Sequence, residues 1–386
     1  MDNEYYNSFL DASEKAIKEK KSPATFRLNE DAMVNFVNKS STQQRLSTSL
    51  QKGIEHLDEE LNRFEKNFSN NNNTIFWASS YEDVFDGLKK LIKLNKVKSV
   101  RVPNIKASTI FREIGIKFFL RDENIALRED GDMQFFVADM LFSDTGSLLL
   151  LNQTNNNLQK ITNNCTNVFF TTIDRICNNS NWIEVIQQLS SYRTGAGCQD
   201  MIVYKGLQNT NNYLFIIDNQ RTSLLEKKDL RQALTCINCG RCNDVCPVYQ
   251  TIGDDPYNNV FTGPMANVAL PYLETFDTYG YLSFGCTLCG RCEEVCPLNL
   301  PIRDMIVDTR HYFLTNEILS KRSRRIVAAM RRALLNRSKM NTSRFLKRHL
   351  FMKTLSSDFK KNRRIPPFSK ESFNKSYKNS AGKSNE

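Results

Sequence analysis

The sequence predicts an α/β domain followed by an α-helical, cysteine-rich domain. Three observations predict it. Apolar runs of strand length alternate with helical patterns between residues 71 and 225. Eight of the eleven cysteines form two copies of one spacing between residues 236 and 297. The segments beside those two copies have helical periodicity, so they predict helices and not strands around the cysteines.

The first 70 residues have a helical pattern. Apolar side chains recur at helical spacing at Leu50, Ile54, Leu57, Leu61 and Phe64. The asparagine run at 70–73 ends this pattern. We therefore expect an N-terminal helical segment over 1–70, ahead of the α/β domain.

The α/β domain is expected over 71–225. Strands are predicted at 74–78, 97–102, 116–120, 135–139, 147–152, 168–172 and 213–218. Helices are predicted at 81–94, with Ser80 as N-cap, and at 104–113 and 181–190. The segment Asp144-Thr-Gly146 predicts a β-turn, and a small ligand-binding turn is the alternative. This alternation predicts three layers.

The two cysteine runs share the spacing C-x2-C-x2-C-x3-C-P. The first holds Cys236, Cys239, Cys242 and Cys246 before Pro247, and the second holds Cys286, Cys289, Cys292 and Cys296 before Pro297. This is the run of bacterial ferredoxins with two clusters. Because each of the four irons in a cubane binds one thiolate, the eight cysteines predict two [4Fe–4S] clusters and one-electron transfer.

In such ferredoxins the fourth cysteine of each run binds the other cluster. Carried over to this chain, cluster 1 takes Cys236, Cys239, Cys242 and Cys296, and cluster 2 takes Cys286, Cys289, Cys292 and Cys246. Gly240 and Gly290 allow the backbone to approach each cluster closely. Pro247 and Pro297 redirect the chain after the crossing cysteine.

Structural zinc is the main alternative for these cysteines. A zinc site gathers four thiolates or imidazoles around one ion, and two identical triple-cysteine loops fit that pattern poorly. Disulfides are disfavoured, because nothing in the sequence indicates export. Three cysteines outside the motif are expected to be buried thiols: Cys165, Cys177 and Cys198.

The part of the chain around the two runs predicts an α-helical dicluster ferredoxin domain over 226–312. Residues 247–285 separate the runs, which is far longer than a hairpin link. Segments 229–235 and 301–308, before the first run and after the second, have helical patterns.

The net charge of +11 is concentrated near the C-terminus. Residues 321–386 hold 20 Lys or Arg and 3 Asp or Glu, so the rest of the chain is mildly acidic. We expect a basic tail over 313–386, with an amphipathic helix at 324–335 and disorder from about Phe368. Such a tail fits a partner subunit, peripheral contact with a membrane or nucleic acid, and a solvated helix is the alternative.

The sequence predicts neither export nor catalysis. It lacks a signal-peptide pattern and an apolar window of about 18 residues, so we expect a cytoplasmic protein without a transmembrane segment, or one peripheral to the inner face of the membrane. No GxGxxG, Walker A or GxSxG motif is present, and the histidines His56, His311 and His349 are isolated. We expect no catalytic residue, and an electron-transfer subunit of an oxidoreductase complex.

Several short motifs carry a resemblance to a known family. They are Asp144-Thr-Gly-Ser-Leu-Leu-Leu150, Ile217-Asp-Asn-Gln-Arg-Thr222, Arg231-Gln-Ala-Leu-Thr-Cys236, and a linker with Pro247-Val-Tyr249, Ile252-Gly253, Tyr257 and Gly263-Pro264. Over about 70–310 the chain resembles the lactate utilization protein B family, the iron–sulfur subunit of a bacterial L-lactate oxidation system. Segment 101–106 departs from the family, which carries a Lys/Ser-rich loop there, and the chain beyond 310 does not resemble it closely.

The resemblance implies a fold and partners. The α/β domain would be a lactate-utilization domain, similar to the NagB/RpiA/CoA-transferase class. The clusters would relay electrons while L-lactate is oxidised to pyruvate. The partners would be a cysteine-rich subunit with a CCG motif, a second lactate-utilization-domain subunit and a respiratory electron acceptor.

Three other functions remain open from the sequence. In the first, the chain is still an electron relay, but the electron donor is another hydroxy acid or related substrate, such as glycolate or glycerol 3-phosphate. The basic tail suggests a nucleic-acid-binding protein with structural clusters. The third alternative is a standalone enzyme with its chemistry in the α/β domain.

Overall fold

A computed structural model describes most of the chain up to residue 315. The described residues are 4–19, 40–70, 73–97, 99–102, 117–120, 133–151, 166–190, 201–206, 211–254, 256–257, 261–315, 325, 328–329, 331–332, 335–336 and 376–377. Glu4–His311 form one compact unit, and Met1–Asn3 with Tyr312–Glu386 form a second. The α/β part and the cysteine runs therefore share one unit, and the boundary between residues 225 and 226 stays a prediction.

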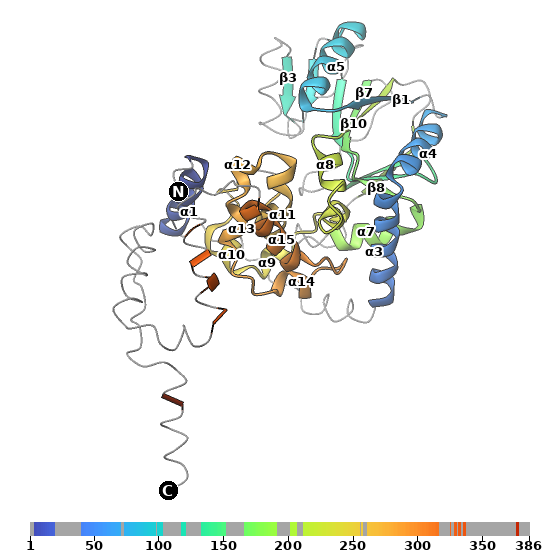
Figure 1. Ribbon diagram of the computed structural model, residues 1–386. Coiled ribbons are helices and arrows are strands. Elements are labelled where there is room, and N and C mark those ends of the chain that lie inside the picture. The colour runs from blue at the N-terminus through green and yellow to red at the C-terminus, as the bar shows by residue number, and fades with distance from the viewer. Residues whose placement is uncertain are drawn as a thin grey trace. The chain divides into compact units, whose positions relative to one another are not determined.

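A six-stranded parallel sheet forms the centre of the α/β part (Figure 1). Its strands, in spatial order, are β1 (Asn73–Ala78), β10 (Asn212–Ile217), β7 (Thr166–Thr172), β4 (Met133–Val137), β2 (Ser99–Val102) and β3 (Lys117–Leu120). Six of the seven predicted strands are confirmed as members of this sheet. Because all six strands run the same way, their carboxyl ends share one edge.

The central strands β10, β7 and β4 contribute buried residues to a core on each face of the sheet, which explains their nearly continuous apolar runs. Alternate residues of β10 point to opposite faces: Phe215 packs with α5 (Tyr81–Leu94), and Ile216 packs with α4 (Leu57–Ser69). The core on the α4 side also includes residues of a smaller sheet. The three predicted layers are therefore present.

The smaller sheet was not predicted. Its strand order is β8 (Ile176–Cys177), β5 (Met140–Phe142), β6 (Ser147–Leu151) and β9 (Met201–Tyr204). The sequence predicts only β6 as a strand, because β5 and β8 are too short to display a period of two residues. The turn predicted at Asp144–Gly146 is confirmed between β5 and β6, with Gly146 at φ 62°.

The N-terminal helices explain the early helical pattern. Within the described residues they are α1 (Glu4–Lys18), α3 (Ser40–Glu55) and α4, and His56 interrupts the helix between the last two. The pattern across residues 50–64 thus belongs to two helices, although it reads as one. Ser80 caps α5 as predicted: its side chain accepts from the Asp83 N–H, and the Asp83 carboxylate accepts from the Ser80 N–H.

The other predicted helices have mixed outcomes. The helix predicted at 181–190 is confirmed as a 3-10 turn, η1 (Ser180–Trp182), followed by α7 (Ile183–Ser190). The helix predicted at 104–113 lies outside the described residues, as does most of the basic tail predicted over 313–386.

The part that carries the cysteine runs is helical, as predicted. Within the described residues of 221–315 there is no strand. Its elements are α8 (Arg221–Leu225), η3 (Arg231–Thr235), α9 (Arg241–Asp244), α10 (Pro247–Ile252), α11 (Gly263–Leu273), α12 (Phe276–Tyr279), α13 (Leu282–Gly285), α14 (Arg291–Glu294) and α15 (Ile302–Thr315).

Helix α11 explains the long interval between the runs. Every residue of α11 is buried, and the helix contacts α8, η3, α9, α10, α12 and α13. Its first residue, Gly263, has φ 61°, and a Cβ there would lie 2.1 Å from Asn243 Oδ1. The linker thus supplies the central helix of the dicluster part.

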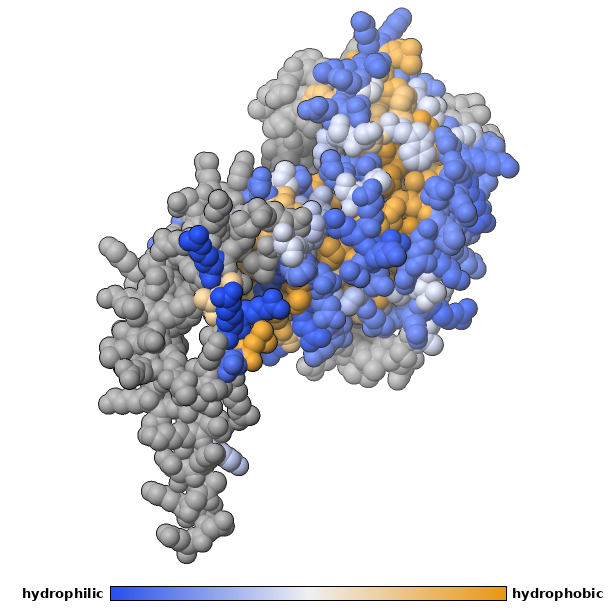
Figure 2. Space-filling model, viewed as in Figure 1, coloured by the Kyte–Doolittle hydropathy of each residue, from blue (hydrophilic) through white to orange (hydrophobic). Residues whose placement is uncertain are grey.

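The surface of the α/β part combines charged helices with apolar atoms. Figure 2 shows a band of apolar atoms between hydrophilic side chains on one face of the chain. On the edge strand β1, Trp77 is 47 % exposed, and its indole N–H donates to Glu65 Oε1 at 3.2 Å. Among the described residues, no helix has the length and apolar character needed to cross a membrane.

Candidate metal centre

The two cysteine runs fold into matching loops. A short helical element ends at the first cysteine of each: η3 at Cys236 and α13 at Cys286. The residue before the second cysteine is left-handed in both loops, and so is the glycine after it. The φ angles are 57° at Asn238, 56° at Leu288, 79° at Gly240 and 82° at Gly290. The sequence predicts this backbone only at the two glycines.

Backbone N–H groups point at the sulfur atoms in both loops. The N–H of Asn238 lies 3.4 Å from Cys236 Sγ, and the N–H of Leu288 lies 3.3 Å from Cys286 Sγ. The left-handed turns aim these donors inward. Such donors stabilise the negative charge of a thiolate that binds metal.

The fourth cysteine of each run is held in a similar way. Cys246 Sγ accepts from the Tyr249 N–H at 3.5 Å, where Pro247 opens α10. Cys296 Sγ accepts from the Leu300 N–H at 3.5 Å. The fourth thiol of each run therefore faces a backbone donor from the segment that follows it.

Electrostatic interactions divide the thiols into two groups, and each group contains cysteines from both runs. Burial, with the charges of Cys236 and Cys296, raises the pKa of Cys239 to about 12. Burial also raises the pKa of Cys246, to which the charges of Cys286 and Cys289 contribute. Cys296 thus neighbours the first run, and Cys246 neighbours the second.

The two groups also adjoin each other. The pKa of Cys242 is raised well above its ordinary value by burial and by the charges of other cysteines, Cys296 and Cys292 among them. Because Cys292 belongs to the second group, a chain of interacting thiols joins both groups.

The two loops differ in their exposure to solvent. In the first loop Cys239 and Arg241 are buried. In the second loop the equivalent residues Cys289 and Arg291 are exposed. The pKa of Cys289 is lowered, chiefly because its sulfur accepts from the Arg291 backbone N–H. At these two positions the second loop therefore lies nearer the solvent than the first.

The donor set fits the predicted clusters. No disulfide joins any of the nine described cysteines. Within the described ranges, no three His, Cys, Asp or Glu side chains are arranged to hold a single metal ion. A cubane has another requirement, because each of its four irons binds a different thiolate. Eight thiols in two adjoining groups, each with N–H donors, meet that requirement.

One described cysteine lies apart from these groups. Burial raises the pKa of Cys177 to about 11, and its side chain is fully buried. The expectation of a buried thiol is therefore confirmed for Cys177. Cys165 and Cys198 lie outside the described residues.

Both runs line one surface depression of about 550 Å³. Its lining residues are Asp244, Val245, Pro247, Gln250, Arg291, Glu294 and Val295. The fourth cysteines of the runs, Cys246 and Cys296, directly follow the lining residues Val245 and Val295 in the chain. The depression therefore gives solvent an approach to the region where the runs meet.

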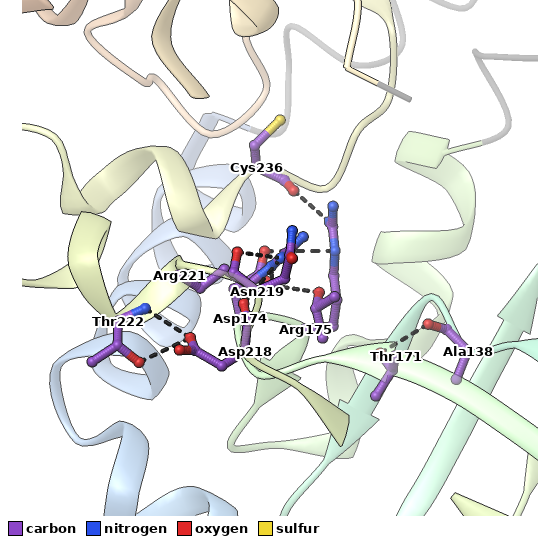
Figure 3. Close-up of polar contacts among 10 residues, drawn as sticks. Ala138, Thr171, Asp174, Arg175, Asp218, Asn219, Arg221, Thr222 and Cys236 are labelled. Carbon is purple, nitrogen blue, oxygen red and sulfur yellow. Dashed lines mark hydrogen bonds and ion pairs between the residues drawn. The ribbon is translucent and has the colours of Figure 1, made fainter. Parts of the chain in front are cut away.

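An ion-pair network lies beside the first run, at the carboxyl edge of the large sheet (Figure 3). Arg221 Nε lies 2.6 Å from Asp174 Oδ1, and Arg175 Nε lies 3.8 Å from Asp174 Oδ2. Arg175 also donates to the carbonyl oxygen of Cys236 at 2.6 Å. Sequence reasoning missed these residues, although Arg221 belongs to a motif that carries the family resemblance.

The comparison with family models defines the class of protein. Residues 232–300 match the model of a 4Fe–4S dicluster domain. The matched segment begins just before the first run and ends after the second. The chain is therefore an iron–sulfur protein with a dicluster domain, which agrees with the prediction from the cysteine spacing.

The comparison with curated proteins identifies its relatives. The chain is 30 % identical over 131 residues to lactate utilization protein B from Bacillus thuringiensis (strain Al Hakam) and from Bacillus cereus (strain AH187). Each alignment covers 34 % of this chain and 27 % of the relative. These matches confirm the resemblance to lactate utilization protein B that the motifs predict.

One solved structure also matches. It is a DUF162 family protein from Deinococcus radiodurans, with 15 % identity and a TM-score of 0.34, over 42 % of this chain and 98 % of that one. The parallel α/β sheet is present in this chain, and its assignment to the NagB/RpiA/CoA-transferase class stays a prediction.

Proposed function

We propose that this chain is an electron-transfer subunit that relays electrons through two [4Fe–4S] clusters while L-lactate is oxidised to pyruvate. The observation that carries the electron relay is the grouping of eight thiols from two matching runs into two adjoining sets. Adjoining centres suit one-electron transfer from one to the next, whereas a structural role needs no such pairing.

The proposed ligand sets are crossed. Cluster 1 binds Cys236, Cys239, Cys242 and Cys296, and cluster 2 binds Cys286, Cys289, Cys292 and Cys246. When bound, the clusters supply one-electron redox chemistry. The chain supplies the thiolates, the N–H donors that stabilise their negative charge, and the buried α11 that holds both loops.

The assignment to lactate rests on the relatives. The matched relatives are named for lactate utilization, and the alignment covers about a third of this chain. We extend the proposal to the partners that the resemblance implies: a CCG-motif subunit, a second lactate-utilization-domain subunit and a respiratory electron acceptor. Mixing anaerobic protein with these subunits and L-lactate should bleach the cluster absorbance. Bleaching by glycolate or glycerol 3-phosphate alone would instead identify the alternative donor.

A second candidate function is favoured by the basic tail. With 20 Lys or Arg among residues 321–386, the tail fits nucleic acid or an anionic membrane surface. Binding to DNA that weakens steeply with salt, together with cluster absorbance that no donor bleaches, would favour a nucleic-acid-binding protein with structural clusters.

The first experiment is anaerobic purification with metal and sulfide analysis, followed by EPR of the reduced protein. Two cubanes require about eight iron and about eight sulfide per chain, with interacting signals from two reduced centres. Zinc in place of iron, or about four iron with one isolated signal, would contradict the two-cluster proposal.

The crossed ligand sets predict the effect of one substitution. Cys296→Ser should impair cluster 1 and leave cluster 2, because Cys296 belongs to the second run but neighbours Cys236 of the first. EPR and iron analysis measure the loss. Cys177→Ser is the matched control, since this buried thiol belongs to neither group, and its iron content should equal the wild type. Selective loss of cluster 2 in Cys296→Ser would refute the crossed assignment.

A further inference from the structure

The carbonyl group of the first cysteine in each run accepts hydrogen bonds from an arginine outside the cysteine motifs. Arg175 donates to the Cys236 carbonyl at 2.6 Å, and Arg310 donates to the Cys286 carbonyl at 2.7 Å. The two arginines come from different elements, one from the turn after β7 and one from α15. Each loop thus has its own arginine donor from outside the motif, in addition to the backbone shape that the two loops have in common.

Arg175 belongs to the α/β part, and a buried ion pair fixes its position. The side chain of Asp174 is 4 % exposed and that of Arg221 is 7 % exposed. Arg221 also donates to the carbonyl groups of Asp218 and Asn219, so it is held from several sides. Figure 3 shows Arg175 extending from this network toward Cys236. The carboxyl edge of the large sheet therefore reaches the first cysteine loop.

Arg310 is held differently. It donates to the Ser283 carbonyl through Nε at 2.9 Å, and its guanidinium lies over the Phe284 ring at 5.5 Å from the centroid. The Phe284 side chain is 41 % exposed. Arg310 thus sits at the more exposed loop, whereas the side chain of Arg175 is only 16 % exposed.

We propose that Arg175 is a positioning residue that holds the cluster 1 loop and raises the reduction potential of cluster 1, and that Arg310 does the same for cluster 2. This inference rests on the proposed function. Reduction adds one negative charge to a cluster, and a fixed guanidinium beside the ligand loop stabilises that charge. The attraction is stronger where water is excluded, so Arg175 has the larger effect.

The consequence is a link between the two parts of the unit. The α/β part supplies the charge that tunes cluster 1, through a side chain that its own buried carboxylate orients. The dicluster part tunes cluster 2 by itself, through α15. The two clusters can therefore differ in potential although their cysteine loops match.

The test compares two matched variants, Arg175→Gln and Arg310→Gln, in the intact anaerobic protein. EPR-monitored redox titration measures the midpoint potential of each cluster, and the signal lost in Cys296→Ser identifies cluster 1. We expect Arg175→Gln to lower the potential of cluster 1 alone, and Arg310→Gln to lower that of cluster 2 alone. Arg175→Lys keeps the charge without the planar fork, so its cluster 1 potential should lie between wild type and Arg175→Gln.

The outcomes separate this inference from the proposed function. Unchanged potentials in Arg175→Gln with full iron content would overturn the inference and leave the electron relay intact. Equal falls in the midpoint potentials of both clusters would also overturn the inference, because a general loosening of the protein would then explain them. Where Arg175→Gln fails to retain cluster 1, Arg175→Met, which also removes the charge, decides: a potential equal to wild type overturns the role. Wild-type protein without iron would instead refute the proposed function.

Discussion

A buried carboxylate, Asp174, organises the contact between the sheet and the first cysteine loop. Burial disfavours its charged form, but the nearby charges of Arg221 and Arg175 outweigh this effect, so the pKa of Asp174 is lowered below its ordinary value. The carboxylate therefore stays ionised and keeps both arginines in place. Its neighbour Arg221 begins α8 after two left-handed residues, Asn219 and Gln220.

Asp174→Asn should destabilise the protein strongly. Removing one partner of a buried ion pair costs about 3–5 kcal/mol, because Arg221 keeps its charge in a buried position. Urea unfolding of the anaerobic protein, followed by circular dichroism, measures the loss. Asp86→Asn is the control: its pair with Lys89 is exposed, so the loss should stay below about 1 kcal/mol. Equal losses in both variants would contradict this account.

The same pair predicts a pH dependence. Because the pKa of Asp174 is lowered on folding, its stabilisation is complete above the unfolded pKa of about 3.9 and disappears as pH falls through the folded value. The stability difference between wild type and Asp174→Asn should therefore be constant near neutral pH and shrink below about pH 4. A difference that grows on acidification would contradict the ionised pair.

At the level of elements, the contact between α5 and β10 depends on the absence of one side chain. Gly87 lies on α5, and a Cβ there would be 2.7 Å from the Phe215 ring. Phe215 cannot withdraw, because it stacks on Phe76 and Phe170 with centroids 5.0 and 5.5 Å away. The glycine thus sets the distance between the helix and the sheet.

The Gly87→Ala substitution should therefore lower the free energy of unfolding, although alanine usually stabilises a helix relative to glycine. Helix propensity alone favours alanine by about 1 kcal/mol, while overpacking a core costs about 1–3 kcal/mol. Chemical unfolding measures the balance. In a Phe215→Leu background the same substitution should stabilise, because the smaller side chain leaves room for the added methyl group. Destabilisation by the same amount in both backgrounds would show that the ring contact is not the cause.

For the whole molecule, the charge distribution separates the compact body from the tail. Tyr312–Glu386 belong to a second unit, and the positive charge of the chain is concentrated there. The tail therefore suits an anionic partner or surface, while the first unit contains all eight cysteines of the motif.

Removing residues 321–386 should leave the clusters intact. We expect unchanged iron content and an unchanged unfolding midpoint, because the cysteines and the cores that hold them belong to the unit that ends at His311. Binding to anionic vesicles or to DNA, measured over a series of salt concentrations, should fall in the truncated protein. Loss of iron on truncation would contradict this division.

The sequence by itself determined the features that depend on local spacing. The cysteine runs predict the dicluster domain, and apolar periodicity with Ser80 predicts α5 and its cap. The strands of the large sheet were predictable because each is four to seven residues long and contains β-branched or aromatic residues. In all of these, residues close in the chain carry the whole signal.

Only the tertiary structure decided the features that join distant residues. The smaller sheet includes a strand of two residues, which leaves no periodic trace in the sequence. Its pairing depends on neighbours that the large sheet brings together. The bond from Arg175 to Cys236 links positions 61 residues apart, and neither residue indicates the other. Local patterns report the environment of one segment, whereas partners across the fold are chosen by how all segments pack together.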